Sequence, residues 1–265
     1  MAHRRERVGN RPPHRTRRGP AADEGDDRML YGRRPVLEHL AAGAPSERLL
    51  VAQEASRGEN LAEILRRAEE ASVPIRRVPR AELQRLTGGG NHQGVIVVTA
   101  RYRYADLEDL LAPSDAAVLI LDGVMDPHNL GSLLRSADGA GFGGIVIRSR
   151  RAAQVTAAVR RVSAGAAEFV PVARVPNTRL AIDRAKDSGL WVVGLDQDAD
   201  ETLWTSASLE TPVALVLGSE DQGISTTVRQ SCDEVVRIPS KGRVGSLNVS
   251  VAGAVAMFEV ARRRG

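Results

Sequence analysis

From residue 116 onward, short apolar runs alternate with segments whose apolar residues recur at helical spacing. The runs predict strands at Val118–Leu121, Gly144–Ile147, Phe169–Ala173, Trp191–Leu195, Val213–Leu217 and Glu234–Ile238. The other segments predict helices at Leu130–Ala140, Ala153–Ser163, Thr178–Ser188, Ser225–Ser231 and Asn248–Arg263. Strands that alternate with helices form a mostly parallel sheet covered on both faces, and ligands bind at the carboxyl ends of such strands. The pattern therefore predicts an α/β domain over residues 116–265.

Residues 29–103 show the same alternation on a smaller scale. Helical spacing is found around Leu37–Ala41 and at Asn60–Ala71 and Arg80–Leu86. Short apolar runs lie at Leu49–Val51, Val73–Ile75 and Gly94–Val98. This alternation predicts a small, separate α/β layer domain.

Two segments lie outside these domains. Residues 1–28 have no periodic apolar pattern, and they change from basic (residues 4–18) to acidic (residues 23–27). Such a segment cannot bury enough surface to offset its ordering entropy, so we expect a disordered Arg-rich tail. The tail is either simply solvated or a loose arm that tethers RNA. Residues 104–115 end in Pro-Ser-Asp and predict a linker with a helical turn.

Composition narrows the class of protein. The chain has 265 residues, of which 42% are hydrophobic and 26% charged, as in a soluble globular protein. No run approaches the ~18 apolar residues of a transmembrane helix, and the first residues hold no apolar segment typical of a secretory signal, so we expect a cytoplasmic protein without a membrane partner. The net charge of +4, with a pI near 9.8, does not by itself establish a nucleic-acid partner.

Metal and disulfide chemistry are not expected. The single cysteine, Cys232, excludes an internal disulfide framework, and we interpret it as a buried core residue. The histidines are scattered without the spacing of metal ligands: His3, His14, His39, His92 and His128. We therefore predict no metal site.

The Gly-rich segment Asp138–Gly143 resembles the cofactor loop of nucleotide-binding proteins. That loop must follow a strand and open a helix, so that the ligand meets backbone N–H groups. Here a predicted helix precedes the glycines and a predicted strand follows them. We therefore interpret the segment as a helix C-cap and a tight turn.

Three further segments carry candidate chemistry, and the first is Asp126–Ala137. It leaves a predicted strand and begins a helix near Asn129, where Asn is a favoured N-cap. Arg135 follows among Leu133, Leu134 and further apolar residues. A helix that is apolar nearly all round is buried, and a buried Arg needs an anionic partner, either a structural carboxylate or a ligand.

In the second segment, Val216–Ile224, a strand runs into two acids and two glycines. Gly218 would let a ligand approach the backbone closely, and Glu220 would project from the end of the strand. The alternative is an ordinary turn with a capping acid.

In the third segment, Ile238–Ala252, a strand ends at Pro239 and a polar loop follows. Ser246 or Asn248 then starts the last helix. The small residues of this helix imply very close packing against another element.

Together and in this order, the three segments resemble the motifs of the SpoU (TrmH-type) class of the SPOUT RNA methyltransferases. The first motif, an Asn followed six residues later by Arg, matches Asn129 and Arg135. The second, L-G-x-E-x-x-G, matches Leu217, Gly218, Glu220 and Gly223. The third, I-P-x-x-G followed by S-L-N-V-S, matches Ile238, Pro239, Gly242 and Ser246–Ser250. The departures are Ser136, where Thr is usual, and the variable loop at residues 243–245. Residues 29–103 are similar to the ribosomal-protein-like substrate-binding domain of the RlmB branch.

The resemblance implies a fold, a cofactor and site residues. The fold is a SPOUT-type parallel sheet with a carboxyl-terminal trefoil knot, assembled as a homodimer through that domain, and the knot holds S-adenosyl-L-methionine. The cofactor-binding residues would be Leu217, Gly218, Ile238, Ser246 and Leu247. The catalytic residues would be Asn129, Arg135, Glu220, Ser246 and Asn248.

The implied reaction is attack by a ribose 2′-oxygen on the cofactor methyl group, at a guanosine of 23S rRNA. The role of Arg135 stays open between a base, which is demanding because arginine stays protonated, and stabilisation of the alkoxide or alignment of a phosphate. A tRNA or an antibiotic-resistance site of 23S rRNA is an alternative substrate, although the extra amino-terminal domain favours rRNA. The alternative of another class is a non-catalytic RNA-binding protein, which would need neither Ser246 nor Asn248.

Overall fold

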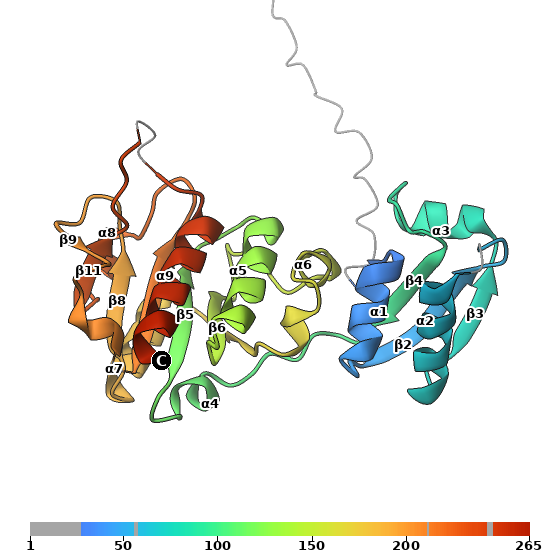
Figure 1. Ribbon diagram of the computed structural model, residues 1–265, viewed down its shortest axis with the longest axis horizontal. Coiled ribbons are helices and arrows are strands. Elements are labelled where there is room, and N and C mark those ends of the chain that lie inside the picture. Colours follow the sequence, from blue (N-terminus) through green and yellow to red (C-terminus); the bar gives the residue numbers. More distant parts are fainter. Residues whose placement is uncertain (1–27, 56–57, 211, 243–245) are drawn as a thin grey trace, which may run out of the picture.

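The computed structural model describes residues 28–55, 58–210, 212–242 and 246–265. Nearly all of the expected Arg-rich tail and the variable loop at residues 243–245 therefore lie outside the described residues. The chain forms two lobes, each built on its own sheet and joined by one segment (Figure 1). A four-stranded sheet forms the amino-terminal lobe and a seven-stranded sheet the carboxyl-terminal lobe.

The amino-terminal lobe is a mixed α/β layer. Its strands are β1 (Met29–Tyr31), β2 (Ser46–Ala52), β3 (Ile75–Val78) and β4 (Val95–Thr99), in the order β1-β4-β2-β3. Its helices are α1 (Arg33–Ala41), α2 (Glu59–Glu70) and α3 (Arg80–Leu86). Strand β2 pairs parallel with β3 and antiparallel with β4. Alternate residues of β2 point to opposite faces: Leu49 meets α1 and α2, and Leu50 meets α3.

The carboxyl-terminal lobe is built on a parallel sheet, as predicted. Its strands are β5 (Ala117–Asp122), β6 (Gly144–Arg148), β7 (Val172–Val175), β8 (Trp191–Leu195), β9 (Glu201–Thr202), β10 (Val213–Gly218) and β11 (Glu234–Arg237). They lie in the order β7-β6-β5-β10-β8-β11-β9, and every described pair is parallel. The sequence pattern missed only β9, which is too short to show a periodicity.

Helices cover both faces of this sheet (Figure 1). One face packs on α5 (Pro127–Gly139), α6 (Ala157–Val162) and α9 (Val249–Arg264), and the other on α4 (Leu107–Leu111), α7 (Thr178–Asp187) and α8 (Thr226–Arg229). Leu119 of β5 belongs to the first core and Val118 to the second, which is why the strand is continuously apolar. Helix α4 lies within the expected linker but is buried in the second core. None of the helices in the described ranges is long and apolar enough to cross a membrane.

The strand order creates a switch point between β5 and β10. The chain leaves β5 toward β6 on one side and leaves β10 toward β11 on the other. Connections that diverge in this way leave a crevice outside the carboxyl ends of the two strands, where ligands bind. Asp122 and Gly218, the last residues of β5 and β10, are register partners at this edge.

Two elements begin later than their apolar residues indicated. The expected strand Phe169–Ala173 is β7, which begins at Val172, and Phe169 is 63% exposed after a 3₁₀ turn. Strand β6 begins at Gly144 and pairs Ile145 with Val172. Before Val172 only the Pro171 carbonyl bonds to β6, accepting from the Ile145 N–H at 3.0 Å, so the strand does not extend back to Phe169. The helix expected from Ala153 is α6, which Thr156 caps.

Helix α5 also begins differently from the prediction. Its N-cap is Asp126, whose side chain accepts a hydrogen bond of 2.8 Å from the His128 N–H, and Pro127 occupies the first turn. Asn129 is therefore inside the helix and is not the cap. At the other end, Gly141 has a φ of +70° in the turn before β6, so the Gly-rich segment is a turn, as interpreted from the sequence.

Candidate active site

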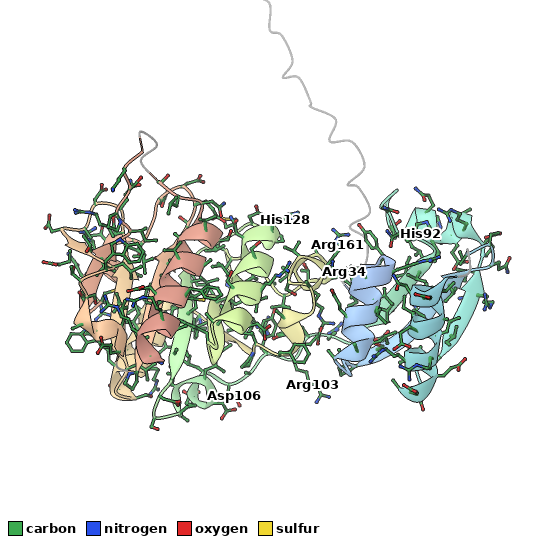
Figure 2. The ribbon with its side chains drawn as sticks, viewed as in Figure 1. Arg34, His92, Arg103, Asp106, His128 and Arg161 are labelled. Atoms are coloured by element: carbon green, nitrogen blue, oxygen red, sulfur yellow. The ribbon has the colours of Figure 1, made fainter. Side chains whose placement is uncertain are left out.

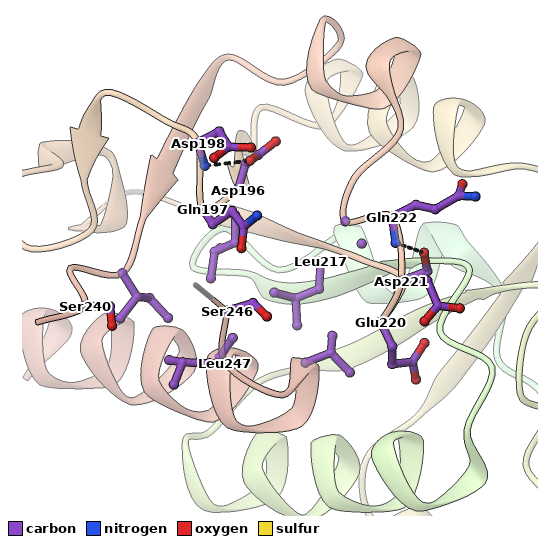
Figure 3. Close-up of a pocket in the computed structure, with 17 residues that line it drawn as sticks. Asp196, Gln197, Asp198, Leu217, Glu220, Asp221, Gln222, Ser240, Ser246 and Leu247 are labelled. Carbon is purple, nitrogen blue, oxygen red and sulfur yellow. Dashed lines mark hydrogen bonds between the residues drawn. The ribbon is translucent and has the colours of Figure 1, made fainter. Parts of the chain in front are cut away.

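A pocket of about 310 Å³ lies at the carboxyl ends of the parallel strands (Figure 3). Its walls come from the loops after β8, β10 and β11 and from the start of α9. The residues that the resemblance assigned to the cofactor all line it: Leu217, Gly218, Ile238, Ser246 and Leu247. Thus the fold brings residues of the second and third motifs to one cavity, on the β8 and β11 side of the switch point.

Gly218 is required by the loop that follows β10. A Cβ on Gly218 would lie 1.8 Å from the carbonyl carbon of Gly223 and 2.0 Å from the nitrogen of Ile224. The loop returns on itself because Ser219 and Gly223 exchange two backbone hydrogen bonds of 3.0 Å. The backbone of Gly223 and Ile224 therefore fills the space beside Gly218 in which a ligand was expected.

A hydrogen-bonded unit joins the three motifs beside the pocket. Asn129 Nδ2 donates to Glu220 Oε1 at 2.7 Å, and Asn248 Nδ2 donates to Asn129 Oδ1 at 3.1 Å. Because a carboxylate only accepts, the bond to Glu220 defines which atom of the Asn129 amide is the donor. Asn129 is 7% exposed, whereas Glu220 and Asn248 lie at the surface. A buried amide therefore holds two exposed polar groups in place.

Both outer members of this unit are themselves anchored. Glu220 Oε1 also accepts from the Asp126 N–H at 3.4 Å. Asn248 is the N-cap of α9, and its Oδ1 accepts from the backbone N–H and the hydroxyl of Ser250 at 2.9 and 2.6 Å. The starts of α5 and α9 and the loop after β10 are thus tied to one another.

Arg135 lies outside this unit, and the prediction that it is buried is wrong. The buried residues of α5 include Leu130, Leu133, Leu134 and Ala137, which form one stripe along the helix. Arg135 projects about 150° away from the middle of this stripe, at ~100° per residue, and is exposed. The structure gives it no hydrogen bond or ion pair with the described residues.

The close packing expected of the last helix is found at Gly253. A Cβ on Gly253 would lie 2.4 Å from a methyl carbon of Leu133 and 2.7 Å from one of Leu217. Helix α9 can therefore approach both α5 and β10 only with glycine at this position. This contact places the start of α9 against the pocket.

Sequence reasoning missed the acidic loop after β8. Asp196, Gln197 and Asp198 line the pocket (Figure 3). Asp196 is paired with Arg229 of α8, and its Oδ1 accepts from the Asp198 N–H at 2.9 Å. The available signal was their position directly after a predicted parallel strand, where ligand-binding residues gather.

The pocket suits a cationic ligand with a flat apolar part. Its described lining includes Asp196, Asp198, Glu220 and Asp221 but no Lys or Arg, and Leu217 and Ile238 contribute apolar surface. S-adenosylmethionine carries a sulfonium, an ammonium group and an adenine ring, and the volume falls in the ordinary range of ligand pockets. The residues present therefore fit this cofactor.

Cys232 is partly buried and unsuited to act as a nucleophile. Burial raises the pKa of its thiol to about 12, and its Sγ lies 3.3 Å from the Val228 carbonyl oxygen. The described residues contain no group of three or more His, Cys, Asp or Glu side chains arranged to hold a metal ion.

Fold and pocket together define an α/β protein with a ligand pocket at the carboxyl ends of its parallel strands and a separate amino-terminal lobe. The family model of the SpoU rRNA methylases matches residues 116–258, and that of the RNA 2′-O ribose methyltransferase substrate-binding domain matches residues 29–105. The chain belongs to the SpoU rRNA methylase family. It is thus an RNA methyltransferase that uses S-adenosylmethionine, as the sequence resemblance implied.

Known proteins match over nearly the whole chain. A tRNA/rRNA methyltransferase of Mycobacterium avium (strain 104) is 44% identical over 257 residues, which cover 96% of this chain and 82% of that protein. The SpoU methyltransferase AviRb of Streptomyces viridochromogenes, crystallised with S-adenosylmethionine, has a TM-score of 0.76 at 26% identity, covering 89% of each chain. The crystal structure of an RNA 2′-O ribose methyltransferase has a TM-score of 0.73 at 27% identity, covering 89% of this chain and 88% of that one.

Proposed function

We propose that the protein methylates the ribose 2′-oxygen of a guanosine in 23S rRNA. The observation that carries this proposal is the hydrogen-bonded unit of Asn129, Glu220 and Asn248 at the rim of the cofactor pocket. A protein that only bound RNA would not need three distant segments tied together there. The separate amino-terminal lobe, which matches a substrate-binding domain of RNA 2′-O ribose methyltransferases, supports a ribose target in a large RNA.

Residues of the proposed site divide into two groups. Leu217, Gly218, Ile238, Ser246 and Leu247 hold the cofactor, which supplies a methyl group on a positively charged sulfur. Asn129, Arg135, Glu220, Ser246 and Asn248 act on the ribose. Residues 29–103 supply RNA affinity and residues 116–265 supply the chemistry, joined through residues 104–115.

The chemistry requires a ribose oxygen that is held in place and can lose its proton. Glu220 Oε2 has one contact, 3.5 Å from the Met125 N–H, so it can accept a hydrogen bond from the ribose hydroxyl. Asn129 and Asn248 hold this carboxylate and the start of α9 at a constant position. Arg135 stays protonated and donates to the RNA phosphate or to the ribose oxygen as negative charge develops.

The protein acts as a homodimer in this proposal. On α9, Val251 is 48% exposed and Phe258 is 51% exposed. Seven residues apart, they lie on the same side of the helix, with the half-buried Val255 between them. A second copy covers this apolar stripe, and static light scattering of residues 105–265 tests it: a monomer would contradict the dimer. The trefoil knot stays a prediction of the family resemblance.

Mapping of 2′-O-methylation on total RNA tests the reaction. We expect a strain that lacks the gene to lose methylation at one guanosine position of 23S rRNA. The wild-type gene should restore this methylation, and an Asn129→Ala variant should not. Loss in tRNA instead would correct the substrate. Unchanged ribose methylation of all RNA would contradict the proposed function.

A further inference from the structure

A second pocket, of about 500 Å³, lies where the two lobes meet. The amino-terminal lobe contributes Arg28, and the large lobe contributes Arg160 and Arg174. The segment between β4 and α4, residues 100–106 and here named the joining segment, contributes Arg101, Tyr102 and Tyr104. None of its lining residues belongs to the cofactor pocket. Its walls therefore form a separate site, here named the junction pocket.

The joining segment is held against the large lobe at this place. Arg160 lies over the ring of Tyr102 at 5.3 Å, and Arg174 lies over the ring of Tyr104 at 3.9 Å. The hydroxyl of Tyr104 accepts from the Val155 N–H at 3.1 Å. These contacts give the junction pocket a preformed wall.

The charge of the junction pocket is positive. Its described lining contains four arginines and no Asp or Glu. Arg28 is paired with Glu47 at 2.6 Å, and Arg160 lies 3.5 Å from Glu168. By contrast, Arg101 and Arg174 are exposed and form no ion pair with the described residues.

The arginines, the tyrosine rings and the volume of the junction pocket suit an anion larger than a single phosphate. A guanidinium stacked on a tyrosine ring keeps N–H donors at its edge, which suit phosphate oxygens. Arginines combined with aromatic rings in a groove are typical of sites that bind single-stranded nucleic acid. The volume lies within the range of pockets that hold small organic molecules, so it has room for a nucleotide.

We propose that the junction pocket binds one nucleotide of the RNA substrate, with Arg101 and Arg174 on its phosphodiester. The inference rests on the proposed function, since RNA is its ligand. Because both lobes and the joining segment line the pocket, RNA bound there contacts the substrate-binding lobe and the catalytic lobe at once.

Two single substitutions in the full-length protein test the site. Arg101→Ala removes an exposed pocket side chain that forms no hydrogen bond or ion pair with the part of the chain that the structure describes, so folding is preserved. Arg103→Ala is the matched control: Arg103 is exposed on the same segment, does not line the pocket, and points away from the protein in Figure 2. The probe is a fluorescent single-stranded oligouridylate of about twenty nucleotides.

The salt dependence of oligouridylate binding measures the loss of a phosphate contact. Loss of one phosphate contact lowers the slope of log K against log salt by about 0.7, which corresponds to about fivefold weaker binding at ~0.1 M salt. We expect this for Arg101→Ala, recovery with Arg101→Lys, and wild-type binding for Arg103→Ala. Equal loss in the two alanine variants, or loss in neither, would overturn the pocket. So would inorganic phosphate that competes as strongly as the oligouridylate.

Two further readouts separate this inference from the proposed function. Crosslinking of a 4-thiouridine oligomer should label the peptide that contains Tyr102 and Tyr104, and label confined to other peptides would contradict the site. Methyl transfer to rRNA by the wild-type protein, together with unaltered RNA binding by Arg101→Ala, would overturn the pocket alone. Weakened RNA binding in that variant, without ribose methylation by the wild type, would overturn the function alone.

Discussion

Asn129 Nδ2 donates a 2.7 Å hydrogen bond to Glu220 Oε1, which joins residues 91 positions apart. The bond connects the first turn of α5 to the loop after β10, across the switch point of the sheet. Since Asn129 also accepts from Asn248, its amide cannot be replaced by an apolar group without freeing two site residues.

Asn129→Ala should therefore abolish most methyl transfer while leaving cofactor binding intact. Loss of a positioned polar group at a reacting site typically lowers kcat about 100-fold. Single-turnover transfer and calorimetry with S-adenosylmethionine measure the two effects. Asn177→Ala, which removes only the cap of α7, is the control and should lower stability without lowering transfer. Wild-type transfer by Asn129→Ala would show that the unit is structural.

Arg135→Ala should separate transfer from RNA binding. Its exposed guanidinium has no partner with the described residues, so its removal leaves the core intact. We expect a ~100-fold loss of transfer, with RNA affinity retained within a few-fold. Arg184→Ala, at an exposed position of α7, is the matched control and should behave as the wild type in both assays. Undiminished transfer by Arg135→Ala would exclude Arg135 from the site.

Gly218→Ala should destabilise the fold, because the added Cβ meets the backbone of Gly223 at 1.8 Å and cannot be accommodated by a side-chain movement. We expect a loss of about 3 kcal/mol or more in the free energy of unfolding, measured with urea. Gly141→Ala, where φ is +70° but no atom lies within 4 Å of the new Cβ, should lose only about 1 kcal/mol. Equal losses in both variants would contradict the close return of the loop.

Tyr102 should titrate late. Burial, with the nearby Glu168 carboxylate adding to it, raises the pKa of its hydroxyl from 10.0 to about 12. The unfolded chain loses this proton first as pH rises, so the stabilisation is complete below pH 10 and is lost as pH rises through about 12. Tyrosinate absorbance should show a late-titrating group that is absent in Tyr102→Phe. Absence of a late group from the wild-type titration would contradict the burial.

Local pattern was sufficient for the parallel sheet and the covering helices, because strand and helix periodicities are properties of short segments. The site residues came from the family resemblance, and the structure brings residues of the second and third motifs to one pocket. Element bounds were less accurate: β7 begins only where β6 offers a partner, and register between distant strands is invisible in the segment itself. The exposure of Arg135 follows from the helical spacing of the buried residues of α5. Arg135 was predicted to be buried because its neighbours in sequence are apolar.

Only the tertiary structure decided what lies beside each site residue. Gly218 faces the returning backbone of its own loop, Asn129 faces Glu220, and the acids after β8 face the motifs of other strands. The junction pocket, likewise, combines side chains from both lobes and the segment between them. Such neighbours come from strand order and helix packing, which bring together residues that are far apart in the chain, so no local pattern encodes them.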